Sequence, residues 1–262
     1  MMRQKIQALA RLTAAVSVIL FTLCSAAPAS AQSPAAEAEA LSQDDEALAF
    51  AEALSEDEAP APQIADPLYY WNKGMFHFND KLYLWALKPV AEVYRAVLPK
   101  PFRTGIQNFY DNIKMPVRFV NCLLQGKTDR AGVELGRFMV NTVCGGLGFW
   151  NMADLESNLQ APPEEDLGQT FGTYGIGNGI YLVMPVLGPS TLRDTLGRAG
   201  DMFIDPVAYI APEASPFLRS YERINWLSLN IGDYESVKEA AVDPYESFKN
   251  IYLQYREKAV KR

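Results

Sequence analysis

Histidine and cysteine are scarce in this 262-residue chain, which contains one histidine and three cysteines. A Ser-His-Asp or Cys-His triad would have to use His77, which lies among aromatic residues in the segment 75–78. Structural zinc takes four Cys or His ligands at close spacing, and the chain after residue 31 has only two cysteines and one histidine. We therefore predict no catalytic residue, no metal and no cofactor, so the chain is not expected to be an enzyme.

Long hydrophobic runs are also missing, since no segment after residue 31 is apolar over the roughly 20 residues that a membrane-spanning helix needs. The only apolar run of note, 14–23, follows the basic residues Arg3, Lys5 and Arg11 and precedes a stretch of small residues. This order is typical of a secretory signal peptide. We predict a signal peptide over 1–31 and export from the cytoplasm.

Two processing sites remain open. Small residues at Ala29 and Ala31 suit an ordinary signal peptidase, which would cleave before Gln32. Alternatively, Cys24 becomes the lipidated first residue of a lipoprotein, although Leu23 is larger than the residue that the lipoprotein peptidase prefers before cysteine. The first alternative discards Cys24, and the second gives the protein a lipid anchor.

Basic residues are absent from the segment 32–66, which holds ten acidic side chains. With little to bury, it predicts a disordered acidic tether over 32–65. The remainder is neutral but polarised: residues 67–137 hold eleven Lys or Arg against five acidic residues, and residues 138–262 hold ten against sixteen. The basic half is interleaved with tyrosine and tryptophan, which in an exported protein favours lipid headgroups over nucleic acid as the partner.

Alternating strand patterns of any length are absent, and apolar residues instead recur at helical spacing. Helices are expected around 78–85, from Pro89 to the prolines at 99 and 101, over 128–140, along 221–237 and after Asp243. Ser190 is the expected N-cap of a further helix. We predict an all-α single domain over 66–262, with one substantial core and long Gly/Pro-rich loops.

The segment 174–190, YGIGNGIYLVMPVLGPS, is rich in glycine but does not fit a nucleotide site. A phosphate-binding loop needs Gly-Lys followed by Ser or Thr at a helix start, whereas Gly179 is followed by Ile180 and Tyr181. A dinucleotide fingerprint would open a helix, which Pro185 and Pro189 interrupt. The segment predicts an extended, oily hairpin or flap. Two roles stay open for it: packing into the core, or forming a gate over an apolar passage.

The same segment carries a family resemblance. The motifs 168–172 (GQTFG), 174–177 (YGIG) and 184–194 (MPVLGPSTLRD) resemble the signature block of the MlaA (VacJ) family. Further matches occur in order from Asp66-Pro67 through Asn108-Phe109, Leu124-Gln125-Gly126 and Gly146-Leu147-Gly148-Phe149 to Asp243-Pro244-Tyr245. The resemblance therefore covers the chain from about Asp66 to its C-terminus.

The resemblance implies a single helical ring-shaped domain with amphipathic interfacial helices, a central channel and the Gly/Pro-rich apolar flap. Members of the family remove mislocalised phospholipids from the outer leaflet of the Gram-negative outer membrane and so maintain its lipid asymmetry. They lie on the periplasmic side of that membrane beside trimeric porins and pass lipid to the periplasmic carrier MlaC. The alternative is a porin-associated structural envelope protein without a lipid path.

Candidate site residues follow from the matched motifs. Those expected at the channel or its gate are Phe76, Phe78, Asn79, Tyr174, Gly175, Gly177, Gly179, Tyr181, Met184 and Pro185. Arg137, Arg193 and Asp194 are candidates for headgroup binding or for structural polar contacts. The chain departs from the family at Ile180, where proline is common and would stiffen the flap. It also has cysteines at 122 and 144, which can pair in an oxidising periplasm or stay as buried thiols.

Overall fold

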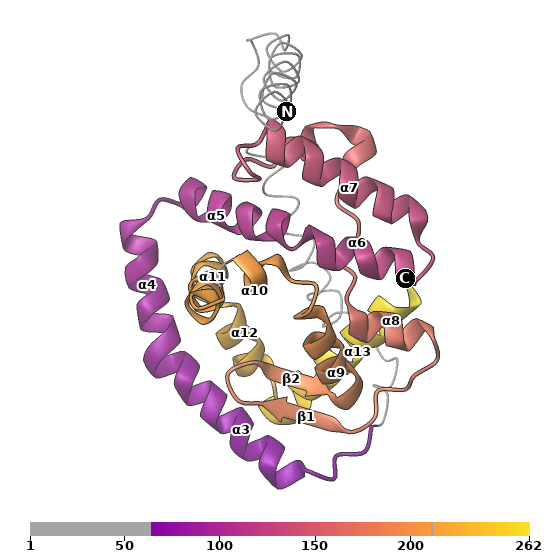
Figure 1. Ribbon diagram of the computed structural model, residues 1–262. Helices are drawn as coiled ribbons and strands as arrows, with labels where there is room; N and C mark the ends of the chain where they lie inside the picture. Colours follow the sequence, from indigo (N-terminus) through magenta and orange to yellow (C-terminus); the bar gives the residue numbers. More distant parts are fainter. Residues whose placement is uncertain (1–63, 211) are drawn as a thin grey trace, which may run out of the picture.

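The structure, a computed structural model, describes residues 64–210 and 212–262 (Figure 1). The predicted signal peptide 1–31, with Cys24, and most of the predicted tether 32–65 lie outside the described residues.

The helices are α3 (Tyr69–Leu82), the π-helix η1 (Tyr83–Leu87), α4 (Lys88–Val97), α5 (Lys100–Ile113), α6 (Met115–Leu124), α7 (Thr128–Val143), the 3-10 helices η2 (Met152–Leu155) and η3 (Ser157–Leu159), α8 (Leu167–Thr173), α9 (Leu192–Asp201), α10 (Pro206–Ile210), α11 (Ser215–Leu229), α12 (Asp233–Ala240) and α13 (Pro244–Lys261). The strands are β1 (Tyr181–Met184) and β2 (Gly188–Thr191).

The helices follow one another around a ring (Figure 1). The arc α3–η1–α4 forms one side, α5 and α6 cross the top of the view, and α8, α9 and α13 form the opposite side. The β1–β2 hairpin lies between α9 and α3 and packs against both. Inside the arc, α11 packs against α4 and α5. The predicted all-α class is confirmed, and the hairpin supplies all the strand structure of the described residues.

Prolines and caps set the helix boundaries as the sequence predicts, with one exception. Pro89 and Pro101 lie in the first turns of α4 and α5, where the missing N–H has no helical partner. Asp243 caps α13, accepting the backbone N–H of Tyr245 at 2.9 Å. The prediction that Ser190 is the N-cap of a helix is wrong. Ser190 pairs with Leu182 in the hairpin, and β2 continues to Thr191. Thr191 is the N-cap of α9 instead.

The prediction of one substantial core is also wrong. Buried apolar side chains form two separate clusters among the described residues. One joins α3, the hairpin and α13 through Phe76, Val183 and Leu253, and the other joins η1, α4 and α11 through Tyr83 and Leu227. Helices arranged in a ring pack mainly on their neighbours, so each contact builds its own small core.

The contact between α8 and α9 depends on glycine. A Cβ atom added at Gly197 would lie 2.3 Å from the backbone nitrogen of Gly168. Only glycine at position 197 lets the two helix backbones approach this closely. This approach brings together the charged residues at the helix ends that are described below.

Candidate functional site

The segment 181–191 forms an antiparallel hairpin in which Tyr181 pairs with Thr191 and Met184 with Gly188. Residues of β1 alternate between buried and half-buried, so Tyr181 and Val183 are each 1% exposed within the α3–α13 core. The tip is different, because Val186 and Leu187 are about half exposed. The hairpin is therefore a core element at its base, which fits the first of the two predicted roles, and an exposed apolar loop at its tip.

Two asparagines of α3 hold the free edge of β1. Asn72 donates to the carbonyl of Tyr181 at 3.1 Å and accepts the N–H of Val183 at 2.8 Å. Asn79, two helical turns further on, donates to the carbonyl of Met184 at 2.9 Å and accepts the N–H of Val186 at 2.7 Å. Each carboxamide thus takes the hydrogen bonds that a neighbouring strand would otherwise supply. Unpaired backbone groups on a strand edge cost free energy when buried and promote pairing with other chains when exposed.

The glycine-rich loop before the hairpin is a chain reversal. Gly175 and Gly179 have φ values of 84° and 71°, which disfavour residues with a Cβ atom. Gly179 also lies against α9, since an added Cβ would lie 3.1 Å from the Cβ of Leu192. Tyr174 is exposed, and its hydroxyl donates to the carbonyl of Leu124 at 2.5 Å. The glycines serve backbone geometry at this turn.

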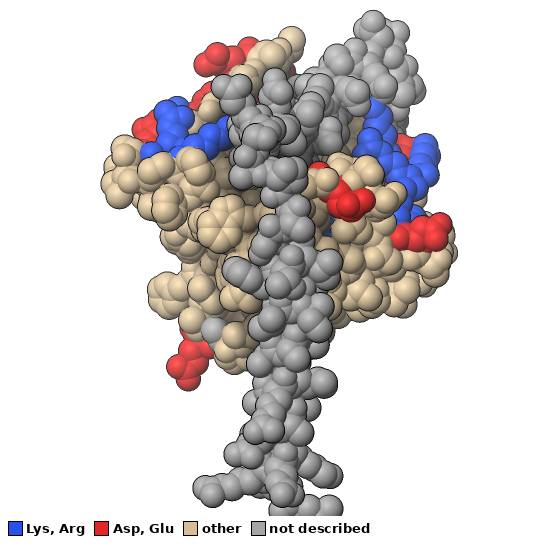
Figure 2. Space-filling model, turned by 90° about the horizontal axis from the view of Figure 1, so that it is seen from above, with Lys and Arg blue, Asp and Glu red and all other residues tan. Residues whose placement is uncertain are grey.

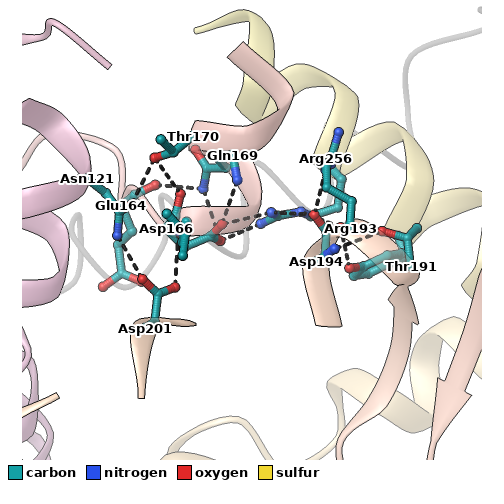
Figure 3. Close-up of polar contacts among 12 residues, drawn as sticks. Asn121, Glu164, Asp166, Gln169, Thr170, Thr191, Arg193, Asp194, Asp201 and Arg256 are labelled. Carbon is teal, nitrogen blue, oxygen red and sulfur yellow. Dashed lines mark hydrogen bonds and ion pairs between the residues drawn. The ribbon is translucent and has the colours of Figure 1, made fainter. Parts of the chain in front are cut away.

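A buried polar network joins α8, α9 and α13 (Figure 3). Arg256 donates to Asp166 at 2.6 Å and to Asp194 at 2.9 Å. Asp166 also caps α8 through the N–H of Gln169, and Tyr252 donates to Asp194 at 2.7 Å. Burial alone would raise the pKa of Asp194, but the charge and hydrogen bonds of Arg256, with Tyr252 and Arg193, outweigh it and lower that pKa. Both carboxylates therefore stay ionised, and the network locks three helices together.

The polar candidates named from the sequence lie in structural contacts. Arg193 and Asp194 are 7% and 5% exposed and bond to each other at 2.9 Å. Arg137 forms an ion pair with Asp154 at 2.8 Å and donates to the carbonyl of Leu159. These partners occupy the carboxylate of Asp194 and the guanidinium of Arg137, so the geometry favours the structural alternative for both. Arg193 keeps one buried nitrogen, Nη2, without a hydrogen-bond partner among the described residues.

The other sequence candidates divide between core and surface. Phe76 and Tyr181 are buried together in the first core cluster. Phe78 is 48% exposed on the other face of α3, and Pro185 is exposed at the hairpin tip. Asn79, Met184 and Pro185 are thus brought to one place, whereas Tyr174 and the glycines lie on the far side of the hairpin base toward α6 and α9. No disulfide joins Cys122 and Cys144 in the described part of the chain.

Sequence reasoning missed a charge cluster at the junction of α5 and α6, with ion pairs that reach α7 and α11. Lys114 pairs with Glu222 of α11, and Arg118 pairs with Glu134 at 3.0 Å and Glu164 at 3.6 Å. Burial, followed by the charge of Glu164, raises the pKa of Asp111 to about 7. We call Asp111, Lys114, Arg118, Glu164 and Glu222 the central charge cluster. Asp111, Lys114 and Arg118 lie within eight residues, but Glu164 and Glu222 are far from them in the sequence, so the sequence did not show that the five come together.

Large apolar side chains are more often exposed than buried in the described residues. They form stripes at helical spacing on three helices: Val90, Val93 and Val97 on α4, Leu135, Met139 and Val143 on α7, and Leu192 and Leu196 on α9. Figure 2, which views the ring from the side of α5 to α7, shows most charged side chains of that face gathered toward one end of the ring axis. The visible part of the opposite end carries few charges, among them an acidic side chain at the lower left of the view. Apolar patches of this extent mark a surface that another apolar phase covers.

None of the described helices is both long and apolar enough to cross a bilayer. The stripes on α4 and α7 instead lie on short amphipathic helices with charged opposite faces. Helices of this kind lie in the plane of a membrane interface.

Comparison with known proteins places the fold among lipid-transport components. The profile of the MlaA lipoprotein family matches residues 64–259. The intermembrane phospholipid transport system lipoprotein MlaA of Escherichia coli (strain K12) is 32% identical over 192 residues, covering 72% of this chain and 76% of that protein. The Haemophilus influenzae protein of the same name is 30% identical over 197 residues, with 72% and 76% covered.

A solved structure agrees with these relatives. It was described under the heading "Structural basis for maintenance of bacterial outer membrane lipid asymmetry" and is 31% identical in sequence. It superposes with a TM-score of 0.68 and covers 75% of this chain and 99% of its own.

Proposed function

Because this chain belongs to the MlaA lipoprotein family, we propose that it takes part in intermembrane phospholipid transport. It removes mislocalised phospholipids from the outer leaflet of the Gram-negative outer membrane, and so maintains the lipid asymmetry of that membrane. It acts from the periplasmic side, after export by its signal peptide. The proposal involves no bond making or breaking, and His77 has no hydrogen-bond partner among the described residues that could make it part of a catalytic pair.

The observation that carries the proposal is the exposure of apolar side chains on the outer helices. Apolar stripes cover α4 and α7, whereas the central charge cluster keeps the Lys114 and Glu164 side chains 39% and 65% exposed. A water-soluble protein would bury the apolar stripes. A phospholipid needs both environments, with apolar contact for its acyl chains and polar groups for its headgroup. We propose that the ring encloses such an amphipathic path.

The hairpin tip and α9 provide an apolar wall of this path. The buried face of α9, with Arg193 and Asp194, packs on α8, so Leu192 and Leu196 lie on its opposite face. Figure 1 places α9 on the inner side of α8, which turns that face toward the middle of the ring. The exposed tip residues Val186 and Leu187 belong to the adjoining hairpin. Movement of this tip would open or close the path.

We further propose two protein partners. The outward stripe of α4 contacts either the bilayer or a trimeric porin, and the end of the ring axis that carries most charges in Figure 2 faces the periplasm. A periplasmic MlaC-like carrier would receive the lipid at that end. Charged surfaces suit a transient handover, because they speed encounter without holding the complex.

Lipid transfer from proteoliposomes tests the proposal. The full chain, reconstituted with a fluorescent phospholipid, should load a purified periplasmic lipid carrier. Leu196→Glu should stop loading, because it puts a charge on the apolar wall at a side chain already 57% exposed. Leu155→Glu, at a 64% exposed leucine of η2, is the matched control and should transfer normally. Porin association with no lipid transfer by the unaltered chain would instead identify a structural envelope protein.

A further inference from the structure

The chain's only histidine lies in a cleft that the proposed lipid path does not use. This cleft, of about 250 Å³, opens between α3 and the start of α13. Its basic lining groups are Lys73 and His77, one helical turn apart on α3, and Lys238 of α12. Phe76 and Tyr245 form its apolar wall. Pockets for drug-sized molecules measure ~300–1,000 Å³, so this cleft admits a small polar group but not two acyl chains.

The acidic groups of the cleft already have hydrogen-bond partners within the protein. Asp80 is 4% exposed and accepts hydrogen bonds from Tyr234 at 2.9 Å and Lys238 at 2.5 Å. Asp243 is occupied as the cap of α13 through the N–H groups of Tyr245 and Glu246. Asp80 also pairs with Lys81 of α3 at 3.8 Å, but in the described residues neither Asp80 nor Asp243 forms an ion pair with Lys73.

Lys73 and His77 retain unused donors. The ammonium of Lys73 donates to the phenol oxygen of Tyr69 at 2.8 Å and has no carboxylate within ion-pair distance in the described part of the chain. That hydrogen bond raises the pKa of Lys73, so the group stays charged. His77 contacts the ring of Phe76 edge-on at 5.7 Å between centroids. Two nitrogen donors with no carboxylate partner, beside a cleft of headgroup size, fit an anion with several acceptor oxygens.

The surroundings favour a lipid as the carrier of that anion. Lys81 continues the line of Lys73 and His77 at the same four-residue spacing, and its ammonium lies 5.5 Å from the ring of Trp85. Tyr70 and Trp85 are 91% and 76% exposed on the same stretch of helix. Exposed aromatic rings beside lysines are what a helix presents to the headgroup layer of a bilayer.

We propose that the cleft between α3 and α13 binds the phosphate of an anionic phospholipid headgroup through Lys73 and His77. The acyl chains remain in the membrane beside the exposed aromatic residues of α3. This site lies outside the α9 wall and would hold the ring in the leaflet. The choice of a lipid over free phosphate rests on the proposed function, whereas the phosphate chemistry rests on the donors of the cleft alone.

Because His77 is the only histidine, labelling histidine with ¹⁵N gives an NMR signal that reports on this cleft alone. The full chain in nanodiscs of phosphatidylcholine, at constant pH, is titrated with dihexanoyl phosphatidylglycerol. A saturable shift of the His77 resonances is expected. Dihexanoylglycerol, which lacks the phosphate, should give none, and an equal shift with it would overturn the proposal. Saturation by glycerol 3-phosphate at the same concentration would overturn the lipid assignment and identify a free-phosphate site.

Substitutions of Lys73 test whether its charge contributes to phosphatidylglycerol binding. Lys73→Gln should weaken phosphatidylglycerol binding about tenfold, the loss expected for one charge-assisted hydrogen bond, and Lys73→Arg should restore most of it. Lys100→Gln removes the same charge from exposed α5 and should leave binding unchanged. Equal weakening by both glutamine variants would show a diffuse charge effect and contradict the site. Lipid transfer to the carrier should stay normal in Lys73→Gln. The headgroup site and the proposed lipid transport can therefore be tested, and rejected, independently of each other.

Discussion

The side chain of Asn79 on α3 accepts the backbone N–H of Val186 at 2.7 Å and thereby ties the tip of the hairpin to the outer arc of the ring. Its amide nitrogen completes the clamp on the carbonyl of Met184 at 2.9 Å. The exposed tip has no other hydrogen bond to α3 in the described residues beyond this carboxamide. The mobility of the tip is therefore controlled by one side chain.

Asn79→Ala should release the tip. Loss of two hydrogen bonds at a half-buried site costs roughly 1–2 kcal/mol, so hydrogen exchange at the Val186 amide should accelerate about 5- to 30-fold. Asn158→Ala, at an exposed asparagine of η3, is the control and should leave exchange at the Val186 amide and lipid transfer unchanged. If the hairpin gates the lipid path, transfer to the carrier changes in the same variant. Faster exchange with unaltered transfer would contradict gating.

Arg256→Met should be the most damaging single change in the α8–α9–α13 network. It removes the cation that Asp166 and Asp194 share. Asp194 keeps Arg193 and the Asp166 side chain is 37% exposed, so the cost should lie at or below the low end of the ~3–5 kcal/mol expected for an unpaired buried charge. Chemical denaturation followed by circular dichroism measures the loss, with Lys261→Met at an exposed ion pair expected to stay within about 0.5 kcal/mol. The effect should shrink in acid, because the pKa values of both aspartates are lowered and their contribution disappears as the pH falls through them.

Asp111→Asn should stabilise the protein in a pH-dependent way. Burial and the charge of Glu164 raise the pKa of Asp111 to about 7, far above its value of 3.8 in the absence of the fold. A raised carboxyl pKa means that folding favours the protonated form, so ionisation destabilises the fold as the pH rises through 7. The variant should gain roughly 1–2 kcal/mol at pH 8.5, allowing for partial solvent screening, and nothing near pH 4. A gain that is equal at both pH values would rule out this cause.

Ile180→Pro should stiffen the hairpin entry. The carbonyl of Ile180 accepts the N–H of Leu192 at 3.0 Å, but its own N–H donates to no backbone group in the described residues. Proline at this place therefore removes no hydrogen bond and restricts the unfolded chain, which adds about 0.4–1 kcal/mol. A thermal shift upward is the expected result. Gly179→Pro is the contrasting variant and should destabilise, because φ at that residue is 71° and proline requires a negative value.

Helix content and helix ends were predictable because they depend on local chemistry. Pro89 in a first turn and Asp243 as a cap act within a few residues of themselves. The stripe expected along 221–237 is not one helix, because α11 ends at Leu229 and α12 begins at Asp233 after Gly232, whose φ is 109°. The motif block 168–194 also identified the family before any coordinates, since motif order survives where overall identity is near 30%. The prediction that Ser190 is an N-cap was wrong because Ser190 pairs with Leu182, so that β2 continues to Thr191 before α9 begins.

The tertiary structure alone decided how the polar groups are used. Arg193 and Asp194 are candidate headgroup ligands in the sequence, but Arg256, 62 residues further on, makes Asp194 part of a structural network. The central charge cluster and the cleft at His77 likewise bring together residues from helices that only the closed ring makes neighbours.

The all-α class, most helix boundaries, the glycine turn and the family could thus be read from the sequence, because each follows from short-range patterns of backbone preference and apolar spacing. The division of the core into two clusters, the hold of asparagines 72 and 79 on the hairpin edge and the pairing of charges became visible only in the folded chain. Hydrogen bonds and ion pairs act over a few ångströms of space, and closure of the ring brings side chains from distant parts of the chain into that range.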